Sequence, residues 1–126
     1  MAVQHFDPEP RAALEARRFA RSVLEPYGDA WQTAELLVSE LATNVIKHAS
    51  TRFVVEVTVL GQVARVGVSD GVAVELAVMD AAEDASSGRG LHLLDSLASS
   101  WGVDLGSGGK CVWFEVPLGG DGSPAA

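Results

Sequence analysis

Residues 52–70 contain two runs of alternating side chains, separated by the dipeptide Gly61-Gln62. A period of two residues is that of a β-strand with one buried face, so both runs are expected to be strands. A two-residue connection with glycine first is typical of a tight hairpin turn. The pattern therefore predicts a hairpin with one firmly buried face, which the rest of the chain has to cover. The inward positions are Phe53, Val55, Val57 and Val59 in the first run and Ala64, Val66 and Val68 in the second.

Asp70 continues the apolar phase of the second run. If the strand reaches Asp70, the carboxylate points to the core side, where it costs several kcal/mol unless another group pairs with it. The alternative is that the strand ends at Ser69 and that Asp70 begins a turn with Gly71. Both readings stay open at the level of the sequence.

A helix is expected from about Asp29 to about His48. Asp29 suits the N-cap, with Gln32 three residues on as in a capping box. Glu40 and Asn44 lie one helical turn apart on a polar stripe that continues to Lys47 and His48, and such a carboxylate and amide can share a hard cation and a water. The apolar stripe beside it, at the spacing of a buried helix face, is Ala34, Leu37, Val38, Leu41, Ala42 and Val45.

The other segments complete an alternation of helices and strands. A first helix is expected after Pro8 and Pro10, and residues 71–87 resemble a lid or binding loop because they lack a clear element. A further helix runs from Leu91 to near Trp101-Gly102, followed by strands over 103–105 and 110–117. The predicted organisation is an N-terminal extension (1–9), one domain (10–118) and a flexible tail (119–126).

Composition excludes several classes of protein. The chain has 126 residues and a formal charge of −8, so it forms one domain, and it lacks the basic footprint that nucleic-acid binding requires. No apolar run is long enough to span a membrane, and no secretory signal is visible. Cys111 is the single cysteine, which excludes an intrachain disulfide and fits a cytoplasmic protein.

Four of the nine basic residues gather in the first helix region. One reading is a solvated helix face, and the other is a docking patch for an acidic partner protein. The same helix is a plausible homodimer interface. The four residues are Arg11, Arg17, Arg18 and Arg21.

Gly88-Arg89-Gly90 precedes the expected third helix and is a candidate anion site. Glycines let backbone amides approach a phosphate, and a helix amino end adds favourable partial charge. The pattern is neither a Walker loop nor a dinucleotide fingerprint. The three histidines lack zinc-ligand spacing, and no serine-hydrolase motif is present.

The order of these features resembles the histidine-kinase-like (GHKL, Bergerat-fold) ATP-binding domain, in its anti-sigma-factor and serine-kinase branch. Residues 40–49 (ELATNVIKHA) are similar to the family's N-box, and residues 66–71 (VGVSDG) to its first glycine box. Residues 87–91 (SGRGL) are similar to the second glycine box, and residues 109–113 (GKCVW) to the closing strand. The resemblance covers roughly residues 10–118.

The resemblance implies an ATP site with Mg²⁺. Asn44 would ligate the Mg²⁺ that bridges the phosphates, and Glu40 would orient or activate the attacking hydroxyl as the catalytic residue. Asp70 would receive the adenine amino group. The other implied nucleotide-binding residues are His48, Gly71, Gly88, Arg89, Gly90, Leu91 and Cys111. Relatives commonly carry threonine at the position of Cys111.

The implied fold is an α/β (α+β) two-layer sandwich, in which a mixed, largely antiparallel sheet has helices on one face. The implied function is a cytoplasmic ATP-binding regulator that phosphorylates a serine on a STAS-type antagonist protein, sequesters a sigma factor, or does both. The alternative is a non-catalytic module that binds a partner on a drifted ATP-binding fold. A third reading is a structural helix-and-sheet domain without a nucleotide.

Overall fold

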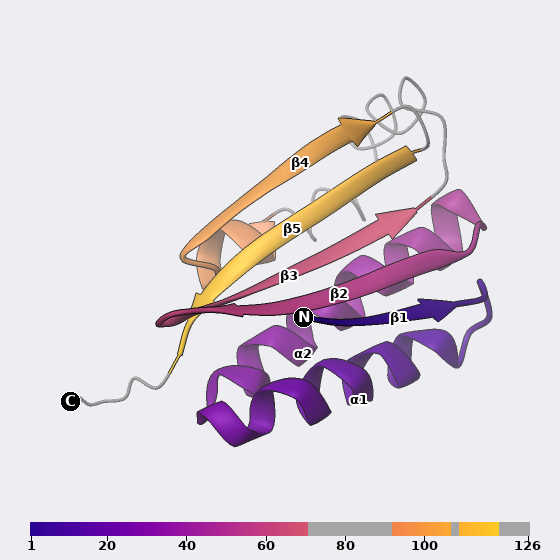
Figure 1. Ribbon diagram of the computed structural model, residues 1–126. Coiled ribbons are helices and arrows are strands. Elements are labelled where there is room, and N and C mark those ends of the chain that lie inside the picture. The colour runs from indigo at the N-terminus through magenta and orange to yellow at the C-terminus, as the bar shows by residue number, and fades with distance from the viewer. Residues whose placement is uncertain (71–91, 107–108, 119–126) are drawn as a thin grey trace.

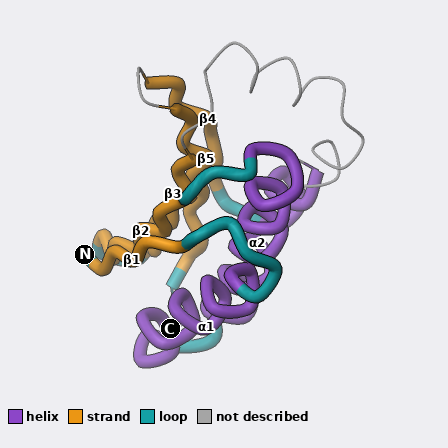
Figure 2. The backbone as a smooth tube through the Cα atoms, turned by 90° about the vertical axis from the view of Figure 1, so that its right-hand side faces the viewer, coloured by secondary structure: helices purple, strands orange, loops and turns teal. Residues whose placement is uncertain are grey.

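The computed structural model describes residues 1–70, 92–106 and 109–118. Within them, five strands form one sheet in the order β1-β2-β3-β5-β4, and each described pairing is antiparallel. Two long helices cover one face of this sheet (Figures 1 and 2), which confirms the two-layer α/β sandwich. The elements are β1 (Ala2–Phe6), α1 (Ala12–Leu24), η1 (Glu25–Tyr27), α2 (Ala30–Asn44), η2 (Val45–Ala49), β2 (Phe53–Leu60), β3 (Val63–Asp70), β4 (Ser100–Gly106) and β5 (Gly109–Pro117).

The expected hairpin is β2 and β3, which pair from Leu60↔Val63 at the turn to Phe53↔Asp70 at the open end. Gly61 has a φ of 62°, a value that glycine adopts without the steric cost of a Cβ, so glycine suits the first turn position. The backbone N–H of Leu118 donates to the carbonyl of Gln62 at 2.7 Å, which ties the end of β5 to this turn. The hairpin prediction is confirmed.

Strand β1 lies within the residues predicted to be an N-terminal extension. It pairs with β2 in antiparallel register, from Ala2↔Val57 to Phe6↔Phe53. The Phe6 side chain is buried and stacks on Phe53, with 5.2 Å between ring centroids. Residues 2–6 therefore belong to the sheet and its core, and the predicted boundary at residue 10 was wrong because five residues carry too little periodicity to reveal an edge strand.

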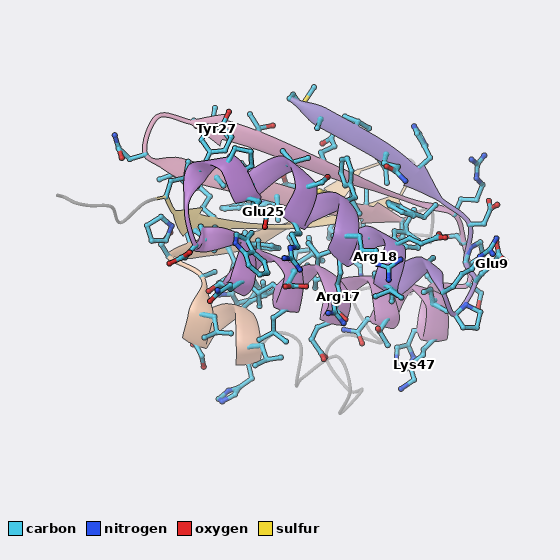
Figure 3. The ribbon with its side chains drawn as sticks, turned by 90° about the horizontal axis from the view of Figure 1, so that it is seen from below. Glu9, Arg17, Arg18, Glu25, Tyr27 and Lys47 are labelled. Carbon is cyan, nitrogen blue, oxygen red and sulfur yellow. The ribbon has the colours of Figure 1, made fainter. Side chains whose placement is uncertain are left out.

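Helices α1 and α2 pack side by side beneath the sheet (Figure 3). The buried face of α1 consists mainly of small residues, which allows the helix backbones to approach closely. At the surface, Arg17 Nε lies 3.2 Å from the Glu35 carboxylate and joins the two helices. Asp29 lies at the N-cap as expected, but its side chain makes no capping hydrogen bond, so the capping box is absent. The buried α1 residues are Ala12, Ala16, Ala20 and Leu24.

The last part of the described chain differs from the expectation in one place. The helix there covers residues 92–97, and β4 already begins at Ser100, so Trp101 belongs to a strand and not to the helix. The indole Nε1 of Trp101 donates to Asp95 at 3.3 Å, which connects the helix to β4. Among the described helices, none combines the length and the apolar character that crossing a membrane would require. The expected loop (71–87) and tail (119–126) lie outside the described residues.

Candidate functional site

Glu40 and Asn44 lie on the last two turns of α2, and both side chains are partly buried. Their position follows from the apolar stripe beside them, because Leu37 and Leu41 are buried against the sheet and hold the helix in one rotation. A carboxylate and an amide thus face the same way one turn apart, as the sequence predicted. Glu40 has an interaction partner in the folded chain.

The α-helical spacing ends at Asn44. Residues 45–49 form a single π-helical turn, in which the backbone N–H of Ser50 donates to the carbonyl of Val45 at 2.8 Å. Ser50 then stops the helix with a φ of 54°. Lys47 and His48 lie within this π turn and both are exposed, and His48 has an interaction partner in the folded chain. Such turns are frequent at functional sites.

Asp70 is the last residue of β3, and the strand does not end at Ser69. It pairs with Phe53 on one side and with Lys110 on the other. Because side chains alternate along a strand, Asp70 shares the helix-covered face with Val66 and Val68, both buried. The reading in which the carboxylate points inward is therefore confirmed. Asp70 also has an interaction partner in the folded chain.

The end of α2 and the end of β3 meet at the same edge of the molecule. Strand β2 starts at Phe53, a few residues after the π-helical turn, and Phe53 is the cross-strand partner of Asp70. Both ends lie on the right-hand side of Figure 1. The polar pair of α2 and the inward carboxylate of β3 therefore belong to one end of the layer between helices and sheet.

Lys110 is a residue that the sequence analysis did not select. It is directly opposite Asp70 on β5 and is partly buried. Counting back in steps of two from the buried Phe114 and Val112 places Lys110 on the helix-covered face. That alternation was visible in the sequence and could have identified Lys110 as the charged neighbour of Asp70.

Cys111 lies on the opposite face of the sheet. Its sulfur would be 3.2 Å from a Cβ added at Gly67, which alternates with the core residues Val66 and Val68. Cys111 therefore does not share a face with Asp70, and its assignment to the nucleobase pocket was wrong. The physical reason is the period of two along β5, which sends neighbours to opposite faces. The remaining predicted site residues, Gly71, Gly88, Arg89, Gly90 and Leu91, lie outside the described residues.

The comparisons with known proteins agree with this geometry. The model of a family described as the histidine kinase-like ATPase domain matches residues 6–116, which is most of the chain. The chain belongs to this family. No curated protein matches it.

Two solved structures show the same fold. One contains the RsbU and RsbW domains of Rv1364c from Mycobacterium tuberculosis and has a TM-score of 0.69 at 21% identity, with 94% of this chain and 33% of that chain covered. The other is the histidine kinase domain of a blue-light activated histidine kinase from Erythrobacter litoralis, with a TM-score of 0.56 at 21% identity and 84% and 60% of the two chains covered. This chain thus spans one third of the first protein and 60% of the second.

Proposed function

We propose that the chain binds ATP with Mg²⁺ in the layer between α2 and the end of β3. In this proposal Asp70 accepts a hydrogen bond from the adenine amino group, and Asn44 provides an oxygen ligand to the Mg²⁺ that bridges the phosphates. The observation that carries the proposal is the inward direction of Asp70 at the end of the sheet where α2 also ends. Membership of the histidine kinase-like ATPase family supports the same nucleotide.

We further propose that the chain transfers the γ-phosphoryl group of the bound ATP to a serine of a STAS-type antagonist protein, with ADP as the leaving group. We also propose that the same chain sequesters a sigma factor in the cytoplasm. Glu40 would accept the proton of the attacking serine hydroxyl, and it lies one turn from Asn44 as this role requires. Arg89 would stabilise charge near the γ-phosphate. The likeness to a structure that contains an RsbW domain supports this choice of reaction class. Positioning and electrostatics supply most of the rate in such transfers.

ATP titration by calorimetry tests the binding step. Asp70→Asn replaces a charged acceptor by an amide whose N–H₂ group repels the adenine amino group, so we expect about 10- to 150-fold weaker binding, equivalent to about 1.5–3 kcal/mol. Asn44→Ala should remove the dependence of ATP affinity on Mg²⁺ and leave the Mg²⁺-free affinity unchanged. Asp29→Asn, an exposed carboxylate at the start of α2, is the matched control and should bind ATP normally. If the wild-type protein and all variants fail to bind ATP, the proposal is wrong.

Transfer of labelled phosphate to a STAS-domain protein tests the second step. Glu40→Gln should retain ATP binding but lose transfer by about 10²- to 10⁴-fold, the usual contribution of a general base. Arg89→Ala should also retain ATP and lose transfer. Unchanged transfer in either variant would remove that residue from the mechanism.

The second candidate function is a non-catalytic module that binds a partner through the same fold. Cys111 stands where relatives commonly carry threonine, but it lies on the other face of the sheet from Asp70, so this replacement does not favour the module. Normal ATP binding with no labelled serine in any STAS protein would favour the module over the kinase.

A further inference from the structure

The face of the sheet opposite α1 and α2 is not covered by any described helix (Figure 2). We call it the open face. Its residues are those that alternate with the core positions, and they include apolar side chains such as Val54 and Leu60 as well as charged ones such as Glu56 and Arg65. A depression of about 160 Å³ lies in this face, across four neighbouring strands. It is lined by Glu56, Thr58, Arg65, Gly67, Asp104, Cys111 and Trp113.

Trp113 on β5 forms one wall of this depression. Its two cross-strand partners are both glycines, Gly67 on β3 and Gly102 on β4. A Cβ at Gly102 would be only 2.7 Å from the indole ring, so the ring lies directly over that glycine. A Cβ at Gly67 would be 3.2 Å from the Cys111 sulfur, so the sulfur lies over this glycine and forms part of the floor of the depression. The two glycines therefore let the indole and the sulfur lie close to the sheet.

Arg65 lies over the indole and pairs with Glu115. The Arg65 guanidinium lies 4.1 Å from the ring centroid of Trp113, as in a cation–π contact. The same guanidinium is 3.8 Å from the Glu115 carboxylate, so its charge is balanced within the open face. Arg65 consequently orients the indole and leaves little positive charge to balance other acids nearby.

Two further carboxylates line the depression without a partner among the described residues. Glu56 on β2 is directly opposite Gly67, so it lies on the far side of β3 from Trp113, and both residues line the depression. Adjacent strands are about 4.8 Å apart, so about 10 Å separates the backbones of β2 and β5. Asp104 on β4 adds a second carboxylate beside Cys111. An indole and two acids that have no partner in the described part of the chain lie around one small hollow, and together they form a site complementary to a cation.

We propose that the open face docks a basic segment of a partner protein, with one arginine or lysine side chain inserted between Glu56 and Trp113. Charge complementarity selects this occupant, because two carboxylates and one guanidinium line the depression and Glu115 already pairs with the guanidinium. A volume of 160 Å³ accommodates a guanidinium or ammonium head with part of its stem. Trp and Arg side chains are also the residues that dominate binding energy in protein interfaces.

The proposal is independent of the ATP site, because these residues lie on the opposite face of the sheet from Asp70. The probe is a blocked pentapeptide of alternating glycine and arginine, and its matched control carries citrulline, which is nearly isosteric and neutral, in place of each arginine. Binding is followed on ¹⁵N-labelled full-length protein by NMR. We expect the arginine peptide to shift the indole N–H of Trp113 and the amides of Gly67 and Cys111 in a saturable manner, and the citrulline peptide to shift none of them.

Charge variants separate this site from the general attraction of a chain with a charge of −8. The double variant E56Q/D104N removes both carboxylates that line the depression and should weaken peptide binding by about tenfold or more, as for close charge pairs at interfaces. The double variant E15Q/D29N removes the same charge from the helix side and should change affinity by less than about twofold, because exposed charges at that distance are screened. Both variants should bind ATP as the wild type does.

Three results would overturn the proposal. One is equal weakening in the two double variants, which would show attraction to net charge alone. Another is a set of peptide-induced shifts centred on α1 and α2. The third result combines two observations: the peptide causes no shift, and sedimentation shows that the wild-type protein self-associates whereas E56Q/D104N does not. That result would mean that the open face binds a second copy of the chain.

Discussion

Replacement of Phe6 by alanine tests whether β1 is part of the folded domain. Phe6 is 4% exposed although it lies on an edge strand. Its ring stacks on Phe53 at 5.2 Å and meets Phe19 edge-on at 6.4 Å between centroids, so three aromatic rings from β1, β2 and α1 join at this corner. If residues 1–9 were only an extension, the substitution would have almost no effect on stability.

The magnitude follows from burial. Truncation of a buried phenylalanine to alanine costs about 3–5 kcal/mol, which combines lost transfer energy with the cavity left behind. We expect a value near the lower limit, because an edge strand relaxes more easily than a central one. Phe6→Leu keeps most of the volume and loses the two ring contacts, each worth about 0.5–1.5 kcal/mol, so it should cost about 1–3 kcal/mol. The free energy of unfolding of a single domain is about 5–15 kcal/mol, so Phe6→Ala should remove a large part of it.

Urea denaturation followed by circular dichroism measures the effect. With a slope of about 2 kcal/mol per molar urea, a loss of 3–5 kcal/mol lowers the midpoint by about 1.5–2.5 M. His5→Ala is the matched control, since His5 is the exposed neighbour of Phe6 and should change stability by less than about 0.5 kcal/mol. A change in Phe6→Ala as small as in the control would refute the assignment of β1 to the core.

Three further predictions concern stability. Gly102→Ala should cost about 1–3 kcal/mol in urea denaturation, because its Cβ would meet the Trp113 ring at 2.7 Å; a neutral result would contradict the position of that ring. Ser50→Gly should gain about 0.5–1 kcal/mol in the same assay, since a φ of 54° strains serine more than glycine, and a loss would argue against this helix end. A double-mutant cycle on Arg17 and Glu35 should give a coupling free energy of only about 0.2–1 kcal/mol despite their 3.2 Å contact, because the pair is partly exposed to solvent. A larger coupling free energy would mean that solvent screens this pair less than its exposure implies.

The parts of the fold that the sequence predicted share a strong local period. The alternation around Gly61-Gln62 predicted β2, β3 and their turn, because each residue in a strand reverses the direction of its side chain. The same rule supplied one of the two readings left open for Asp70, the one in which it points toward the helices, and the structure confirms that reading. The spacing of the buried residues of α2 placed Glu40 and Asn44 on one helical turn.

The errors occurred where the local period is weak or where a motif resemblance was used in place of the period. Strand β1 has only five residues, and it forms because it pairs with the edge of β2, which lies about fifty residues later in the chain. The π-helical turn after Asn44 has the residue types of an ordinary helix, so only the backbone conformation reveals it. Cys111 was assigned from a resemblance to one motif, although the alternation along β5 favours Lys110 for the helix-covered face.

The sequence by itself determined the hairpin of β2 and β3, the two long helices and which side of each is apolar, because those properties depend on neighbours within a few residues. Only the tertiary structure decided which strands are neighbours, that β1 closes one edge of the sheet, and that Lys110 lies opposite Asp70. It also brought Glu56, Trp113 and Asp104 around one hollow in the open face. These relations join residues that are far apart in the chain, and they depend on strand order and register, which packing of the whole domain selects.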